Sequence, residues 1–198
     1  LDFGILLNLG IDHLDYHGNL SSYKKAKKRI LLAKQIISYE TDPYKLFEWI
    51  TESKPKKIKL KNLPYRYEII TETVINDSKS TNYHSLSYAL KKANYLFNKS
   101  KYSLIVCGDP KKEGYRKIKV DGPERVYIFG LHAKDITECI DHPKKVIVNS
   151  LDDALNCIYD SNNSKNILFS PGYPSGNDFK NYSERGEYFN NNLKKYLP

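Results

Sequence analysis

The strongest constraint on the fold is an alternation that runs from residue 103 almost to the end of the chain. Short apolar runs, rich in β-branched and aromatic residues, are separated by stretches with helical spacing. This order is typical of β-α-β units, in which the strands are parallel and helices cover the sheet. We therefore predict an α/β fold with a Rossmann-like, mostly parallel sheet and helices on both faces. The predicted strands span residues 103–107, 125–129, 146–148 and 166–169, and the predicted helices span 133–140, 151–159 and 183–196.

Upstream of this alternation the pattern is weaker, and it changes near residue 60. The charged segment 54–61 has the composition of a linker. We therefore predict a boundary there, with residues 1–60 forming an incomplete strand–helix piece and residues 61–198 forming a full domain. The elements predicted on the two sides are a strand at 3–9, helices at 21–37 and 44–50, a strand or hairpin at 67–75, and a helix at 84–97.

Composition excludes several classes of protein. The formal net charge of +9 comes mostly from scattered lysines, and no recognisable nucleic-acid module accompanies them, so we expect no nucleic-acid partner. The three cysteines are odd in number and far apart, which favours a reducing compartment over a disulfide framework. No apolar run approaches the roughly 18 residues of a membrane span, so no membrane partner is expected. The sequence contains no Met, which leads us to expect part of a longer translation product.

Polar residues gather where the predicted strands end, at the edge where open parallel sheets bind ligands. The segment 76–82 reads Asn-Asp-Ser-Lys-Ser-Thr-Asn and precedes a predicted helix. Asp77 or Thr81 could simply cap that helix. Lys79 is harder to explain as a cap, because a cation among hydroxyls at a helix N-terminus suits an anionic ligand.

Other candidate residues also have simple structural interpretations. Lys111 and Ser175 lie in loops rich in Gly, Pro and Asp, which could be ordinary turns. His13 lies in an Asp-His-Leu-Asp-Tyr-His segment that could ligate a metal or merely cap the next helix. Lys27 belongs to a basic run that is most simply a solvated helix face. A lysine near a divalent metal can, however, be carbamylated and become an anionic ligand.

Taken together, four blocks of the sequence resemble the Mur ligase family, and within it the members that add D-glutamate. The segment 76–82 is the most specific block, because sister ligases that add other amino acids differ there. The resemblance covers residues 1 to about 30 and 60–198, most of the chain. The four blocks are residues 8–15 with 23–30, residues 63–68, residues 76–82 and residues 170–189.

The resemblance implies a cytoplasmic, ATP- and Mg²⁺-dependent enzyme that forms an amide bond. The carboxylate of UDP-N-acetylmuramoyl-L-alanine is phosphorylated, and the amine of D-glutamate attacks the acyl phosphate, largely through positioning and charge neutralisation. By motif position, His13 would bind Mg²⁺ beside a carbamylated Lys27, and these two would be the catalytic residues. Arg66 would contact the nucleotide phosphates and Asp77 the ribose. The residues implied to hold D-glutamate are Lys79, Thr81, Lys111, Ser175, Gly176 and Tyr182.

The sequence also departs from the family. The family has a UDP-binding domain and a Gly-rich phosphate loop before the equivalent of residue 1, and no such loop occurs in this sequence. Only 38 residues separate Lys27 from Arg66, too few to complete the central domain. The segment Gly172-Tyr173-Pro174 replaces smaller residues, and its bulk could displace Ser175.

These departures lead us to expect that the chain alone neither hydrolyses ATP nor makes the product. Four interpretations remain open at this point. The chain could be a truncated ligase that lacks an N-terminal portion, or one half of a split ligase whose partner chain supplies the phosphate loop. It could also be a non-catalytic remnant that binds an amino acid or a protein. The fourth is a nucleic-acid-binding domain, which a steep salt dependence of DNA binding would indicate.

Overall fold

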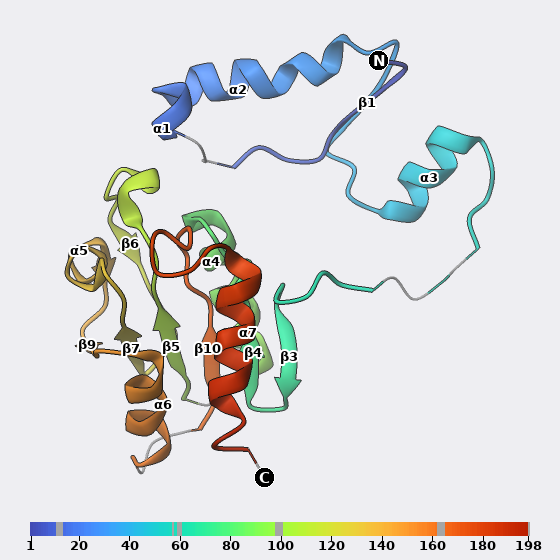
Figure 1. The fold of residues 1–198 in the computed structure, drawn as a ribbon. Helices are drawn as coiled ribbons and strands as arrows, with labels where there is room; N and C mark the ends of the chain where they lie inside the picture. Colours follow the sequence, from blue (N-terminus) through green and yellow to red (C-terminus); the bar gives the residue numbers. More distant parts are fainter. Residues whose placement is uncertain (11–13, 57, 59–60, 98–100, 162–164, 198) are drawn as a thin grey trace. The chain divides into compact units, whose positions relative to one another are not determined.

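The computed structural model describes residues 1–10, 14–56, 58, 61–97, 101–161 and 165–197. The chain divides into two compact units, Leu1–Lys61 (unit 1) and Asn62–Pro198 (unit 2), shown in Figure 1. In the described part of the chain, no helix has the length and apolar character needed to cross a bilayer.

Unit 1 is a small α/β piece that buries few side chains. β1 (Phe3–Leu6) and β2 (Gln35–Ser38) form a two-stranded parallel sheet. Among its described residues only Gly4, Leu6 and Tyr23 are buried, so its core is minimal. The elements between and after the two strands are α1 (Leu14–His17), α2 (Leu20–Lys28), a 3-10 turn (Arg29–Leu32) and α3 (Pro43–Thr51).

The prediction of one helix over residues 21–37 is wrong in its second half. Helical structure ends at Leu32, and Gln35–Ser38 form β2, in which Ile36 lies opposite Gly4 of β1. Gly4 is needed for this packing, because a Cβ there would lie 2.2 Å from the carbonyl oxygen of Ile30. Pairing with a strand some thirty residues earlier overrides the local helical spacing.

Unit 2 is built on a six-stranded sheet in the order β3-β4-β10-β5-β7-β9. Every neighbouring pair is parallel except β3 and β4, which form a hairpin. The predicted α/β class with a mostly parallel sheet is therefore confirmed. The strands are β3 (Glu68–Thr71), β4 (Val74–Asn76), β5 (Ser103–Val106), β7 (Arg125–Ile128), β9 (Lys145–Ile147) and β10 (Ile167–Phe169); β6 (Ile118–Lys119) and β8 (Ile140–Asp141) form a separate parallel pair.

Helices cover both faces of this sheet (Figure 1). α4 (Tyr83–Leu96) and α5 (Ala133–Cys139) share one apolar cluster with one face. α6 (Leu151–Tyr159) and α7 (Tyr182–Leu193) share a second cluster with the other face. Successive residues of β5 alternate between the two clusters, as the pleat of a strand requires.

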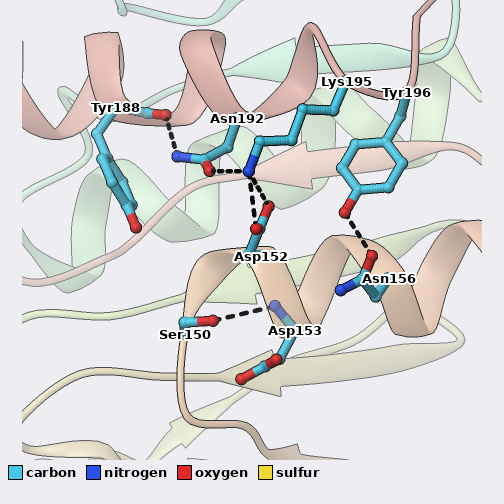
Figure 2. A network of polar contacts seen from close by, with 8 residues as sticks. All are labelled: Ser150, Asp152, Asp153, Asn156, Tyr188, Asn192, Lys195 and Tyr196. Carbon is cyan, nitrogen blue, oxygen red and sulfur yellow. Dashed lines mark hydrogen bonds and ion pairs between the residues drawn. The ribbon is translucent and has the colours of Figure 1, made fainter.

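A polar network joins α6 to the C-terminal end of α7 (Figure 2). The Lys195 ammonium donates to both carboxylate oxygens of Asp152, at 3.0 and 2.8 Å, and the Tyr196 hydroxyl donates to Asn156 at 2.5 Å. The Tyr196 ring also stacks on Tyr159. The ion pair is solvent-exposed, so it contributes at most about 1 kcal/mol to stability. The network lies at the opposite end of α7 from Tyr182, the first residue of that helix.

Candidate functional site

β4 and β10 are adjacent parallel strands whose following helices pack on opposite faces of the sheet. β4 leads to α4 on one face, whereas β10 leads to α7 on the other. In open α/β sheets, ligands bind in the crevice outside the carboxyl ends of such strands. We call residues 77–82 after β4 the first loop, residues 107–111 after β5 the second loop, and residues 170–176 after β10 the third loop.

Backbone hydrogen bonds join the three loops. The Gly172 N–H of the third loop donates to the Ser80 carbonyl of the first at 3.0 Å. The Asp109 N–H of the second loop donates to the Pro174 carbonyl of the third, also at 3.0 Å. Gly108 has φ +116°, and a Cβ there would lie 2.1 Å from the Pro174 carbonyl oxygen, so only glycine permits this contact. The three loops therefore form one continuous rim.

The six residues predicted to bind the amino acid all lie on this rim or at the start of α7. The Lys79 ammonium lies 4.1 Å from the centroid of the Tyr182 ring, so the structure brings these two side chains together. Ser175 is buried, Thr81 is half-buried, and Lys111 and Gly176 are exposed. The rim thus combines two cations with hydroxyl groups, a chemistry that suits a small ligand with carboxylates.

The large side chain of the third loop, that of Tyr173, packs into the core of unit 2. The Tyr173 side chain is fully buried in the cluster beneath α4 and α5, and burial raises the pKa of its hydroxyl. Gly172 has φ +73°, and a Cβ there would lie 2.7 Å from Leu86. The expected displacement of Ser175 by this segment therefore has no support, because the tyrosine side chain is accommodated in the apolar cluster of unit 2.

Asp77 is a buried carboxylate at the start of the first loop. One of its oxygens accepts the Tyr67 N–H at 2.9 Å, and the other accepts the Ser170 hydroxyl at 2.9 Å. Burial raises the pKa of Asp77 to about 6, against the opposing effects of these two hydrogen bonds and of the Arg66 and Lys92 charges. The carboxylate thus holds the turn before β3 against the loops after β4 and β10.

That turn presents Arg66 to solvent. Tyr65 and Tyr67, on either side of Arg66, both have positive φ, at 59° and 47°. Such a backbone is strained for tyrosine, and contacts with the first loop and α7 hold it in place. The Lys79 N–H donates to the Tyr65 carbonyl at 2.8 Å, and a Cβ at Gly186 of α7 would lie 2.4 Å from the Tyr65 ring. Arg66 and Asp77, predicted to contact a nucleotide, are therefore neighbours.

The residues predicted to hold a metal lie in unit 1. His13 is outside the described residues. Lys27 is exposed, and its ammonium lies 5.6 Å from the centroid of the Tyr23 ring. Among the described residues there is no group of three or more His, Cys, Asp or Glu side chains that could hold a metal ion. The predicted roles of His13 and Lys27 in binding Mg²⁺ therefore stay predictions.

Two residues of the site escaped the sequence analysis. Arg185 of α7 is fully buried. The sequence carries one indication of this, because Arg185, Phe189 and Leu193 follow each other at spacings of four residues and so share one helix face. Asp178 follows the third loop, and one of its carboxylate oxygens accepts the Leu131 N–H at 3.0 Å. It therefore links the loop after β7 to the same edge of the sheet, and no local pattern indicates this.

Comparisons with known proteins agree on one family. Residues 1–100 match the family profile described as the Mur ligase middle domain, a range that crosses from unit 1 into α4 of unit 2. Relatives named UDP-N-acetylmuramoylalanine--D-glutamate ligase include one from Thermosipho africanus, 34% identical over 135 residues, and one from Thermosipho melanesiensis, 31% identical over 175 residues. These alignments cover 64% and 84% of this chain.

The chain spans about a third of the length of these relatives, 31% and 38% respectively. A third relative of the same name, from a Hydrogenobaculum species, is 27% identical over 264 residues that cover 98% of this chain and 63% of the relative. That alignment is longer than the chain, so at least 66 of its positions have no counterpart among the 198 residues here. This agrees with the small number of residues, 38, that separate Lys27 from Arg66 in the sequence.

Proposed function

Because this chain belongs to the Mur ligase family, we propose that unit 2 binds D-glutamate as the incoming amine of an ATP-dependent ligase of peptidoglycan synthesis. The observation that carries the proposal is the continuous rim that the three loops form at the carboxyl ends of β4, β5 and β10. It presents Lys79, Thr81, Lys111 and Ser175 from three loops that hydrogen bonds hold together. Residues 61–198 would be the C-terminal domain of such a ligase and residues 1–60 part of its central domain.

The chemistry of the rim matches that of the proposed ligand. D-glutamate has two carboxylates and one amine, and the two lysines are matched to the carboxylates. The Lys79 ammonium is held over the Tyr182 ring, which fixes its direction before any ligand arrives. Ser175 and the Gly176 backbone would give hydrogen bonds, and Thr81 would add a hydroxyl. Such preorganisation reduces the entropy lost on binding.

The nucleotide would bind beside the turn before β3, which contains Arg66. The exposed Arg66 guanidinium suits a phosphate. Both oxygens of Asp77 already accept a hydrogen bond, but a carboxylate can accept about four, so the group keeps the capacity to accept from a ribose hydroxyl. The proposed roles of His13 and Lys27 in holding Mg²⁺ rest on motif position alone, as does UDP-N-acetylmuramoyl-L-alanine as the second substrate.

Calorimetric titration with D-glutamate tests the proposal, with L-glutamate as the stereochemical control. We expect D-glutamate to bind, and we expect Lys79→Gln and Lys111→Gln to weaken binding by about tenfold each. Lys101→Gln is the control, because Lys101 is also an exposed lysine but precedes β5, at the opposite end of that strand from the second loop, where it pairs with Glu124. Equal binding of both enantiomers, or an effect of Lys101→Gln as large as that of the other two, would refute the proposal.

A second assay separates a complete catalyst from a binding module. The sequence has no phosphate loop, so we expect the pure chain to release no phosphate from ATP when D-glutamate and UDP-N-acetylmuramoyl-L-alanine are present. Binding of D-glutamate without phosphate release would favour a truncated ligase or one half of a split ligase. Phosphate release that depends on D-glutamate would show instead that the chain is catalytic on its own.

A further inference from the structure

The rim formed by the three loops is held by one buried guanidinium group. Arg185 is the fourth residue of α7 and is fully buried. Its Nε donates to the Ser78 hydroxyl at 3.1 Å, and its Nη2 donates to the Ser78 carbonyl at 2.8 Å. Its Nη1 donates to the Tyr173 carbonyl at 3.0 Å. Ser78 belongs to the first loop and Tyr173 to the third, so one side chain joins both loops to α7.

The same guanidinium also lies beside the second loop. A Cβ at Gly108 would lie 3.1 Å from Nη1 of Arg185. Burial raises the pKa of the Cys107 thiol, and the charge of the guanidinium acts against this larger effect. The Ser78 hydroxyl, which accepts from Arg185, donates in turn to the Tyr182 carbonyl at 2.8 Å. Every segment proposed to bind the amino acid is therefore in contact with Arg185 directly or through Ser78.

This arrangement is costly for the fold, which indicates a reason beyond packing. Within the described residues, no carboxylate lies within ion-pair distance of the guanidinium, so a buried cation is satisfied mainly by neutral acceptors. Desolvation lowers the pKa of Arg185 accordingly. An apolar residue would continue the buried face formed by Phe189 and Leu193. It could not direct hydrogen bonds to two loops at once, as the planar fork of arginine does.

We propose that Arg185 is a positioning residue that holds the three loops in the geometry that binds the amino acid, without touching the ligand itself. The inference rests on the proposed function in so far as the ligand is D-glutamate. Its structural part, the coupling of three loops through one side chain, is testable without any ligand.

Hydrogen exchange of the ligand-free chain tests the coupling. The probes are the amides of Ser80, Asp109 and Gly172, one from each loop, each with a backbone hydrogen bond within or between the loops. In Arg185→Lys, which keeps the charge but loses the fork, we expect all three amides to exchange about tenfold faster or more. The Val148 amide, which donates to Ile128 at the β7–β9 edge, should be unchanged. Ser78→Ala removes only the hydroxyl link and serves as the test if Arg185→Lys does not fold. The same three amides should exchange faster in this variant.

Titration with D-glutamate then tests the consequence for binding. We expect Arg185→Lys or Ser78→Ala to weaken D-glutamate binding by about tenfold. Lys195→Gln breaks the exposed ion pair beyond the other end of α7 (Figure 2) and should leave binding unchanged, even if it lowers the melting temperature. Unchanged exchange at the three amides, or a loss of affinity no larger than in Lys195→Gln, would overturn the inference. If the wild-type chain binds no D-glutamate while the three amides still loosen together, the coupling stands and the proposed function fails.

Discussion

The buried carboxylate of Asp77 should make the stability of unit 2 fall as pH rises. Its folded-state pKa is about 6, against an ordinary value of 3.8, so between these values the folded state binds more protons than the unfolded state. Its contribution is fully present below about pH 3.8 and is lost as pH rises through about 6. The shift corresponds to about 3 kcal/mol in total, of which about 2 to 3 kcal/mol falls between about pH 4 and about pH 8.

Asp77→Asn isolates this contribution, because an amide oxygen can still accept the Tyr67 N–H and its NH₂ can donate to the Ser170 hydroxyl. Urea unfolding should be followed through amide NMR signals of unit 2, because the only tryptophan, Trp49, belongs to unit 1. We expect the unfolding free energy of the variant, relative to wild type, to rise by about 2 to 3 kcal/mol between about pH 4 and about pH 8. A difference that is constant with pH, or that changes in the opposite direction, would refute this reasoning.

Three further predictions follow from burial and backbone geometry. Unit 1 buries so few side chains that Trp49 fluorescence should report unfolding at a lower urea concentration than unit-2 amide signals; coincident transitions would contradict this. Gly186→Ala should destabilise unit 2 by about 1 to 3 kcal/mol in urea unfolding, although alanine favours helices, because the added Cβ would clash with the Tyr65 ring. Adding Tyr65→Gly should restore part of the lost stability, and a double variant that is no more stable than Gly186→Ala would contradict this explanation. In the folded chain a thiol reagent should modify Cys157 quickly and Cys107 slowly, because burial raises the pKa of Cys107 to about 12; equal rates would be the contrary result.

Local patterns were sufficient to predict the architecture of unit 2. Short apolar runs alternating with helical spacing gave the parallel sheet, and the rule that ligands bind beyond the carboxyl ends of strands directed attention to the loops around Lys79, Lys111 and Ser175. The resemblance to the Mur ligase family, carried by four blocks of which segment 76–82 is the most specific, is confirmed by the family match over residues 1–100.

Features that depend on distant contacts could not be predicted in this way. β2 exists because it pairs with β1, whereas its own sequence continues the helical spacing of α2. The bulk of Tyr173 suggested a displaced Ser175, because sequence does not reveal that the ring faces the cluster beneath α4. Arg185 occupies a core position of α7, and its importance lies in hydrogen bonds to residues more than ten and more than one hundred positions away.

The central claim is that the three loops at the carboxyl ends of β4, β5 and β10 form an amino-acid site, and the most direct test is to map D-glutamate binding residue by residue. The measurement is a titration of the isotope-labelled chain followed through amide NMR shifts, with L-glutamate in a parallel sample. We predict shifts that are specific to D-glutamate and that cluster at Lys79, Thr81, Lys111 and Ser175. Shifts that are equal for both enantiomers, that lie away from these loops, or that are absent at millimolar D-glutamate would contradict the claim.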